Sequence, residues 1–166
     1  MFKSKTDTKD APTYEVTKSD EEWRSELSPE RYQVLRHAGT EAAWSGELLH
    51  VDGEGEFRCA GCGAVLFDTD SKFDSGSGWP SFDRAKSEGT IIERPDNSLF
   101  MRRVEIVCAR CGGHLGHVFP DGPTETGMRY CVNSLSLTYD DGKEAPVPFE
   151  VGGLDKTGES DAVSES

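Results

Sequence analysis

The sequence predicts a mainly β (α+β) fold in which antiparallel sheets follow two short N-terminal helices. Helix-start signals occur near the beginning of the chain, and short extended segments alternate with turns from about residue 53 onward. Two Cys-x-x-Cys pairs lie far apart, at the ends of such segments. We expect one domain (residues 13–150) between a disordered N-terminal tail (1–12) and an acidic disordered C-terminal tail (151–166).

Each helix is predicted from the residues at its start. Ser19 and Glu22 form a capping-box pattern, in which each side chain can bond the backbone amide of the other residue. The second helix should begin with Pro29 at its first position and bury Leu35. We expect Gly39 to end this helix in the left-handed conformation.

Extended segments are predicted at residues 57–58, 64–67, 90–93, 99–107 and 128–139. A turn at residues 95–97 should join the 90–93 and 99–107 strands. In the last strand, the alternation of side chains places Cys131 and Asn133 on one face, together with Arg129.

The two cysteine pairs, Cys59/Cys62 and Cys108/Cys111, have the spacing of a four-sulfur zinc site, and a glycine follows each pair. The alternative is two independent redox pairs, which would each be expected at the start of a helix. Both pairs instead lie between a strand and a turn. We therefore expect one structural Zn²⁺ ion that clamps distant hairpins together.

Cys131 is the fifth cysteine and has no partner. A reactive cysteine needs a cation or hydrogen-bond donors to lower the pKa of its thiol, and Arg129, His114, His117 and Asn133 supply such groups. Either histidine could donate a proton near neutral pH. The alternative is that Cys131 is a small buried hydrophobic residue.

A glycine-rich loop at residues 74–82 ends with two large aromatic side chains, Trp79 and Phe82. Loops that expose aromatic residues are often binding sites. Composition alone equally favours a role for both residues in covering the core.

The net charge of −13 disfavours binding to nucleic acid or to an anionic membrane surface. No apolar run has the length of a membrane span, and residues 1–10 lack the pattern of a signal peptide. Four paired cysteines and one single cysteine fit a reducing compartment, so we expect a cytoplasmic protein.

Four motifs resemble those of the B-type peptide-methionine sulfoxide reductases, in the same order and spacing. They are Gly-Ser-Gly-Trp-Pro-Ser-Phe (76–82), the two cysteine pairs, Gly-His-Leu-Gly-His-Val-Phe (113–119) and Arg-Tyr-Cys-Val-Asn-Ser (129–134). The resemblance covers residues 19–148. It implies an oxidoreductase that reduces the R epimer of methionine sulfoxide in oxidised proteins to methionine.

The resemblance also implies a role for each candidate residue. The Cys131 thiolate would attack the sulfoxide sulfur and become a sulfenic acid, while His114 or His117 protonates the departing oxygen. Trp79, with Phe82 nearby, would form the apolar platform for the substrate methyl group. Asn133 and Arg129 would hold the sulfoxide oxygen and the thiolate.

Ser77 departs from the commoner pattern of this family, which has a second cysteine at that position. The other four cysteines are assigned to zinc, so no spare thiol remains to form an internal disulfide. We expect a monomer whose sulfenic acid is reduced by an external thiol, such as thioredoxin or a small thiol.

Two other functions remain open from the sequence. In a non-catalytic zinc-ribbon interaction module, Cys131 would be inert. In a peroxide sensor, Cys131 would form a sulfenic acid without a sulfoxide pocket, so replacing Trp79 should leave peroxide sensitivity unchanged.

Overall fold

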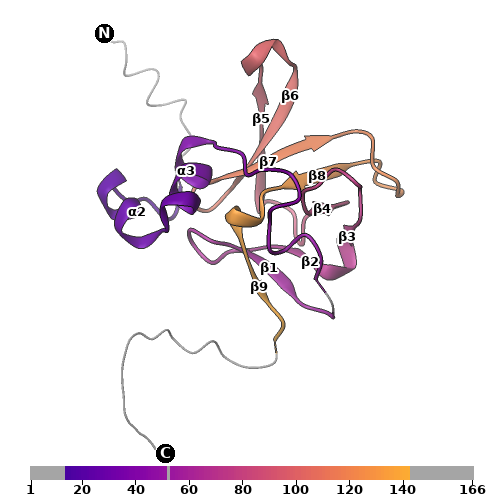
Figure 1. Ribbon diagram of the computed structural model, residues 1–166, viewed down its shortest axis with the longest axis horizontal. Helices are drawn as coiled ribbons and strands as arrows, with labels where there is room; N and C mark the ends of the chain where they lie inside the picture. The colour runs from indigo at the N-terminus through magenta and orange to yellow at the C-terminus, as the bar shows by residue number, and fades with distance from the viewer. Residues whose placement is uncertain (1–13, 52, 143–166) are drawn as a thin grey trace, which may run out of the picture.

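The computed structural model describes residues 14–51 and 53–142, and it confirms the predicted fold class (Figure 1). The expected tails, residues 1–12 and 151–166, lie outside the described residues, as does the end of the expected domain at residue 150. The helices are α2 (Asp20–Glu26) and α3 (Pro29–His37). The strands are β1 (Glu56–Cys59), β2 (Val65–Asp68), β3 (Lys72–Phe73), β4 (Ser81–Phe82), β5 (Ile91–Asp96), β6 (Arg103–Cys108), β7 (His114–Phe119), β8 (Arg129–Val132) and β9 (Leu137–Asp140).

The strands form two antiparallel sheets. One has three strands in the order β2-β1-β9, and the other has six in the order β3-β4-β8-β7-β6-β5. Phe57, Phe67 and Phe82 are fully buried, and the rings of Phe67 and Phe82 stack with centroids 4.2 Å apart. Trp23 from α2 and Leu35 from α3 complete the same core. None of the helices in the described residues has the length and apolar character needed to cross a membrane.

The two helices begin as predicted, but α3 ends differently. Ser19 and Glu22 form the expected capping box, with both hydrogen bonds present (3.1 and 2.9 Å). The left-handed residue after α3 is Ala38 (φ 54°), so the prediction of Gly39 was wrong. The helix ends one residue earlier because the Ala38 amide already bonds the Gln33 carbonyl, and the Gly39 amide bonds it as well (3.0 Å).

The sequence predicted one strand at residues 128–139, but the structure divides this segment. It forms β8 in the six-stranded sheet, then a 3₁₀ turn (Ser134–Ser136), then β9 in the three-stranded sheet. The guanidinium of Arg31 donates to the carbonyls of Leu135 and Leu137 (3.0 Å each). These two carbonyls therefore do not take part in the hydrogen bonds of one continuous strand. The chain therefore crosses between the sheets directly after Asn133.

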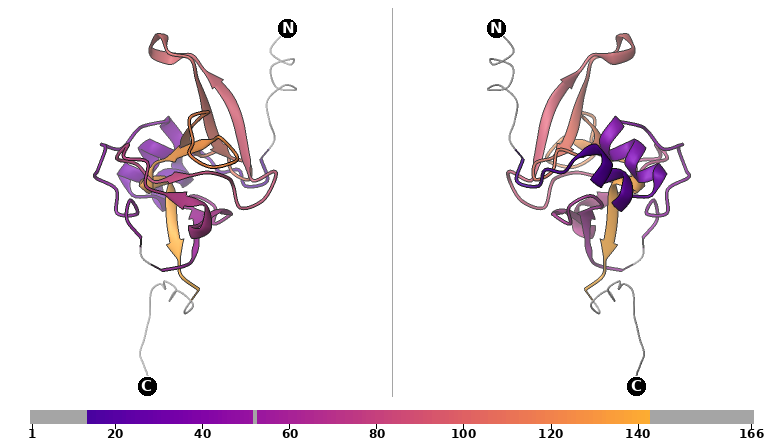
Figure 2. Two further views of the ribbon diagram at one scale, coloured as in Figure 1. Left: turned by 90° about the vertical axis from the view of Figure 1, so that its right-hand side faces the viewer. Right: turned by 90° about the vertical axis from the view of Figure 1, so that its left-hand side faces the viewer.

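The β5–β6 hairpin projects from the body of the molecule (Figures 1 and 2). Strand β5 extends further than predicted, because Pro95 and Asp96 belong to it and not to the turn. Strand β6 is shorter than predicted, because it begins at Arg103. Between them, Leu99 and Phe100 adopt positive φ angles of 57° and 62°, which are incompatible with a strand.

A bulge in β7 determines which way its side chains point. Ile106 pairs with Gly116 and Val107 pairs with His114, so Leu115 has no partner in β6. Residues three apart in a regular strand lie on opposite faces, but the extra residue in the bulge removes that offset. His114 and His117 are consequently neighbours, with ring centroids 5.7 Å apart.

Candidate active site and metal centre

The four paired cysteines meet at one point, as the sequence predicted. Their sulfur atoms all lie within 4.8 Å of one another. Cys59 Sγ is 3.7 Å from Cys111 Sγ, and Cys62 Sγ is 3.6 Å from Cys108 Sγ. A tetrahedral zinc ion with Zn–S bonds of about 2.3 Å requires sulfur atoms about 3.8 Å apart. The cluster therefore fits a metal ion of this size and geometry.

Both cysteine pairs form the same tight turn. The Cys59 amide donates to the Ala64 carbonyl (2.8 Å), and the Cys108 amide donates to the Gly113 carbonyl (2.9 Å). In each turn, a glycine amide bonds back to the carbonyl of the first cysteine (2.8 Å), and that glycine has a positive φ: 85° at Gly63 and 77° at Gly112. This conformation explains why a glycine follows each pair.

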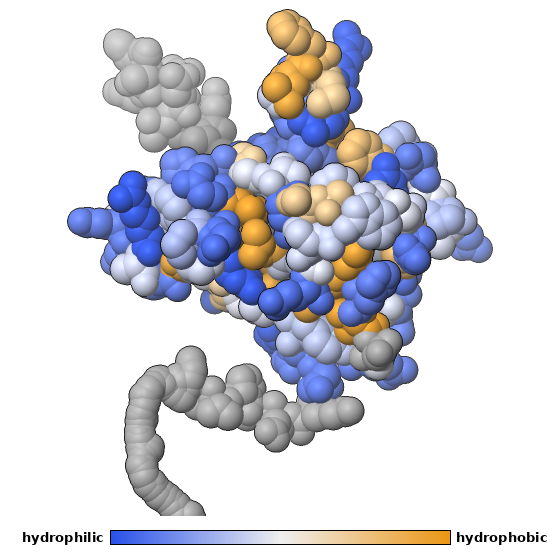
Figure 3. Space-filling model, in the orientation of Figure 1, coloured by the Kyte–Doolittle hydropathy of each residue, from blue (hydrophilic) through white to orange (hydrophobic). Residues whose placement is uncertain are grey.

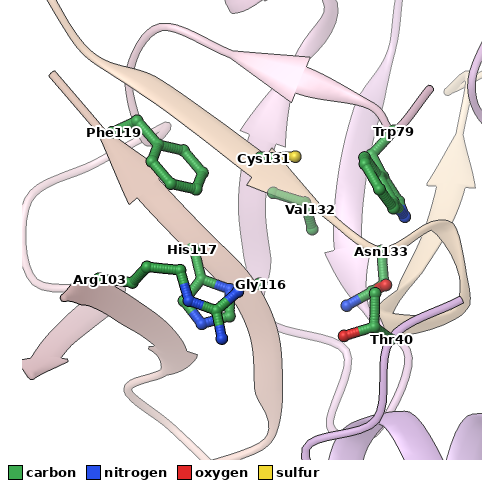
Figure 4. Close-up of a pocket in the computed structure, with 9 residues that line it drawn as sticks. All are labelled: Thr40, Trp79, Arg103, Gly116, His117, Phe119, Cys131, Val132 and Asn133. Carbon is green, nitrogen blue, oxygen red and sulfur yellow. The ribbon is translucent and has the colours of Figure 1, made fainter. Parts of the chain in front are cut away.

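A pocket of about 110 Å³ lies on the six-stranded sheet (Figure 4). Cys131 on β8 pairs directly with His117 on β7 and with Ser81 on β4. Directly paired residues of antiparallel strands project on the same face of a sheet. The residues that line the pocket are Thr40, Trp79, Arg103, Gly116, His117, Phe119, Cys131, Val132 and Asn133.

Glu41 holds two walls of the pocket together. Its carbonyl accepts a hydrogen bond from the indole Nε1 of Trp79 (3.0 Å), and its amide donates to Oδ1 of Asn133 (3.0 Å). The Asn133 Nδ2 atom donates to the carbonyl of Leu115, the bulged residue of β7 (3.0 Å). One buried residue thus positions both the aromatic wall and the amide of the pocket.

His117 lines the pocket and its Nε2 atom is 2.7 Å from Oδ2 of Asp96 on β5. This hydrogen bond holds the pKa of the Asp96 carboxyl well below its usual range. Burial lowers the pKa of the His117 imidazole, while Asp96 raises it and the positive charge of Arg103 lowers it. Burial is the largest of these effects, so the neutral imidazole is favoured.

His114 lies behind His117 and does not line the pocket. Its side chain is buried, with Nδ1 2.7 Å from Oε2 of Glu105. The His114 Nε2 atom is buried and has no hydrogen-bond partner among the described residues. The hydrogen bond to His114 lowers the pKa of the Glu105 carboxyl. Only one of the two candidate histidines therefore reaches the pocket.

Cys131 is half-buried, and this burial raises the pKa of its thiol. The hydroxyl of Ser77, 4.0 Å from Cys131 Sγ, and the guanidinium of Arg129 partly offset the effect. The sequence suggested that neighbouring donors would lower the pKa. Of the four predicted groups, only Arg129 lowers the pKa, and removal of the thiolate from water outweighs its effect.

Two further predicted site residues, like His114, lie outside the pocket lining. The Arg129 guanidinium forms two hydrogen bonds with Asp121 (2.8 and 3.2 Å) and lies 4.5 Å from the ring centre of Phe119. Phe82 is fully buried between Phe57 and Phe67, with its ring turned into the core. The structure therefore brings Phe119, and not Phe82, to the wall opposite Trp79 (Figure 4).

Comparisons with known proteins identify the family of the chain. The SelR domain model matches residues 27–141. The peptide methionine sulfoxide reductase MsrB of Leptospira interrogans serogroup Icterohaemorrhagiae serovar Lai is 55% identical over 126 residues, 76% of this chain and 96% of the relative. That of Methanosarcina mazei is 53% identical over 133 residues, 78% of this chain and 95% of the relative. The chain belongs to the B-type methionine sulfoxide reductase family.

The B-type methionine sulfoxide reductases are oxidoreductases that act on sulfur, so the chain is an enzyme of this class. Among solved structures, the crystal structure of a Mis18 "Yippee-like" domain is similar over 52% of this chain and 95% of its own, with a TM-score of 0.43 and 18% identity.

Sequence reasoning missed three residues that shape the pocket of this B-type reductase: Thr40, Arg103 and Phe119. Phe119 follows His117 by two positions, so the period of a strand could have placed both on one face. Thr40 and Arg103 come from segments distant in sequence, and no local pattern marks them. The Nε atom of Arg103 is buried without a hydrogen-bond partner among the described residues.

Proposed function

We propose that the protein reduces the R epimer of methionine sulfoxide in proteins to methionine, through a sulfenic acid at Cys131. The pocket supports this proposal most directly, because it contains a thiol, a histidine paired with that thiol across two strands, and an aromatic wall. The choice of the R epimer follows from membership of the B-type family.

The chemistry transfers one oxygen atom from the substrate to the enzyme. The Cys131 thiolate attacks the sulfoxide sulfur, the sulfur–oxygen bond of the substrate breaks, and the oxygen ends on Cys131 with one added proton. The substrate sulfur is reduced to the thioether of methionine, and Cys131 is oxidised to a sulfenic acid.

The positions of the polar groups suggest their roles. His117 is the proton donor, because it lines the pocket and its ring is fixed by Asp96. His114 is a positioning residue that packs against His117. Asn133 and Arg103 border the space for the sulfoxide oxygen, and Arg129 favours the Cys131 thiolate by its charge.

The aromatic wall suggests how the substrate is held. Trp79 provides a flat apolar surface for the methyl group, and the bond from its indole to Glu41 fixes the ring. Phe119 takes the place that the sequence suggested for Phe82, which packs in the core instead.

We also propose that Cys59, Cys62, Cys108 and Cys111 hold one structural Zn²⁺ ion. Thiolate sulfur is a preferred ligand of zinc, and four ligands leave no open position for a substrate. The ion would join the end of β1 to the end of β6 and so tie the two sheets together.

The sulfenic acid is recycled by an external thiol, such as thioredoxin or a small thiol, because Ser77 faces Cys131 and the other four cysteines form the metal cluster. Two thiols convert the sulfenic acid to a thiol, with one disulfide and one water as products. We place this monomeric protein, with its folded domain at residues 13–150, in the cytoplasm, where reducing thiols are abundant.

Single-turnover reduction of the separated R and S epimers of a peptide methionine sulfoxide tests the proposal. Wild type should form about one methionine per enzyme from the R epimer alone, as expected for one reacting thiol. Cys131→Ser should form none, and its bound zinc should equal that of wild type, which shows that it is folded. Methionine from Cys131→Ser, or from the S epimer, would contradict the proposal.

A further inference from the structure

The large hydrophobic side chains that are exposed in the described residues all lie on two segments beside the pocket. They are Trp44, Leu99, Phe100, Met101 and Val104. Trp44 follows Thr40 in the loop after α3, and the other four belong to the β5–β6 hairpin, which supplies Arg103. Each segment thus contributes one residue to the pocket wall and places its apolar side chains in solvent.

The hairpin tip extends beyond the rest of the surface, with apolar side chains on the face shown in Figure 3. Phe100 is fully exposed, and 75% of the Leu99 surface is accessible. Both residues have positive φ, a conformation that is unfavourable for residues with a Cβ atom. The backbone therefore holds these side chains outward at a conformational cost, which is typical of functional segments.

The hairpin tip is tied to the site. The Asp96 carboxylate, which bonds His117, also accepts from the Ser98 amide (3.0 Å) and from the Arg103 guanidinium (3.5 Å). Arg103 in turn reaches the Ser98 hydroxyl (3.5 Å). The position of the tip is thus fixed relative to His117 by three polar groups.

Trp44 is also fixed beside the pocket. Its φ is 71°, its amide donates to the Gly78 carbonyl (2.7 Å), and 60% of its surface is exposed. A Cβ atom at Gly78 would be only 3.1 Å from two ring atoms of Trp44, so the indole lies against the residue that precedes Trp79.

The two segments border opposite walls of the pocket. In Figure 4, Thr40 and Trp79 lie on one side of Cys131, and Arg103 and Phe119 lie on the other. A pocket of about 110 Å³ admits the end of a side chain, so the main chain of a peptide substrate must cross its mouth. The neighbours of the sulfoxide then pass close to both segments.

We infer that Trp44 and the hairpin tip (Leu99, Phe100 and Met101) are two apolar subsites that bind apolar side chains of the substrate peptide on either side of its methionine sulfoxide. This inference rests on the proposed function, and it adds a sequence preference to it. Continuity with the pocket identifies the substrate chain as the occupant, since its main chain must cross this surface whenever the sulfoxide side chain enters the pocket.

Peptides of equal length, with one R-sulfoxide at the centre and either leucine or serine at the flanking positions, test the inference. The smallest substrate, N-acetyl-methionine-R-sulfoxide amide, has no flanking residues. Because burial of one large apolar side chain is worth about tenfold in affinity and the peptide has two flanking leucines, wild type should show a KM about 100-fold lower for the leucine peptide.

The variants Leu99→Asn/Phe100→Asn and Trp44→Asn each remove one subsite, so each should lower this preference by about tenfold. Asparagine tolerates positive φ, so the backbone should keep its shape. Their kcat and KM for the smallest substrate should equal those of wild type. Glu125→Asn, at an exposed position that lines no pocket wall, is the matched control and should keep the full preference.

Equal KM values for both peptides in wild type, or an unchanged preference in both variants, would overturn the inference while the activity stands. A change of oligomeric state in sedimentation velocity with Leu99→Asn/Phe100→Asn, at an unchanged peptide preference, would assign the tip to a second copy of the chain. No turnover of even the smallest substrate by wild type would refute the proposed function itself.

Discussion

The Oγ atom of Ser77 lies 4.0 Å from the Sγ atom of Cys131. Ser77 is held in this position by the hydroxyl of Ser75 (2.8 Å), and its own Oγ accepts from the Trp79 amide (3.4 Å). A hydroxyl here can donate to the thiolate but has no means of forming a covalent bond with the sulfenic acid. In the proposed mechanism, the side chain at position 77 would therefore decide how the sulfenic acid is reduced.

Ser77→Cys should convert the protein to an enzyme that forms an internal disulfide. The new thiol would face Cys131 from a loop with positive-φ glycines at positions 76 and 78, which allow it to move closer. After one turnover with sulfoxide, peptide mapping under non-reducing conditions should find a 77–131 disulfide. Wild type should show none, and a disulfide between Cys131 and a cluster cysteine in wild type would contradict the assignment of those thiols.

The reactivity of Cys131 should rise with pH across the neutral range. Burial raises the pKa of its thiol, so the neutral form predominates at pH 7, and the thiolate fraction increases about tenfold per pH unit below that pKa. The rate of alkylation by iodoacetamide, measured against pH, should follow this fraction. Ser77→Ala removes a group that lowers the pKa and should move the curve to higher pH. A plateau already reached at pH 6 would exclude a raised pKa.

Asp96→Asn should slow the reduction of sulfoxide at neutral pH by about 10- to 100-fold, which is part of the roughly 100- to 10,000-fold that a general acid contributes in full. Asp96 raises the pKa of His117 against the effect of burial, so its loss should lower that pKa further and leave less imidazolium. The deficit relative to wild type should narrow as the pH is lowered, because the imidazole then becomes charged in both proteins, while the thiolate fraction falls equally in both. Single-turnover rates against pH, together with an NMR titration of His117, provide the measurement.

Glu105→Gln is the control for that experiment, since Glu105 bonds the imidazole of His114 and not that of His117. It should leave the pH at which His117 titrates nearly unchanged. An equal effect of both variants would indicate a general loss of structure around the two histidines.

Removal of the metal should unfold the domain. The cluster joins β1 and β6, and structural zinc sites contribute on the order of 10 kcal/mol to folding. A strong chelator, or the substitution Cys111→Ser, should abolish the cooperative thermal unfolding transition and release one zinc ion per chain. Cys131→Ser should keep both the ion and the transition. Retention of the wild-type transition without metal would refute a structural role.

Glu41→Ala should raise KM for sulfoxide and lower stability. The Glu41 carboxylate accepts from the amide of Leu135 (2.9 Å), and an amide left unpaired in a buried position costs about 1–3 kcal/mol. The loop that holds Trp79 and Asn133 would then lose its anchor. Glu41→Gln keeps an acceptor and should restore both properties. Unchanged KM in the alanine variant would show that the backbone contacts alone hold the loop.

Local signals were sufficient for much of the fold. The capping box at Ser19, the glycines after each cysteine pair, and the shared face of Cys131 and Asn133 depend on residues within a few positions of one another. The cysteine cluster, though assembled from distant hairpins, was also predictable because its donor set leaves few alternatives.

Features that depend on tertiary contacts were not predictable. Arg31 interrupts the last strand from a helix about 100 residues away, and Phe82 is drawn into the core by its stacking on Phe67. Arg103 reaches the pocket because of a hairpin whose tip adopts strained angles, which no composition rule signals. In each case the decisive neighbour is absent from the local sequence.

The bulge at Leu115 makes the length of β7 as important as its composition. Because Leu115 is unpaired, the gain of one residue between His114 and His117 would move one imidazole to the opposite face of the sheet, whereas the loss of one residue removes the bulge and leaves both imidazoles on one face. Substitution at Gly116 is excluded for a different reason, because a Cβ atom there would lie 2.0 Å from the carbonyl oxygen of Cys131. Between the two histidines, the strand can therefore lose its one unpaired position, but an inserted residue separates the histidine pair.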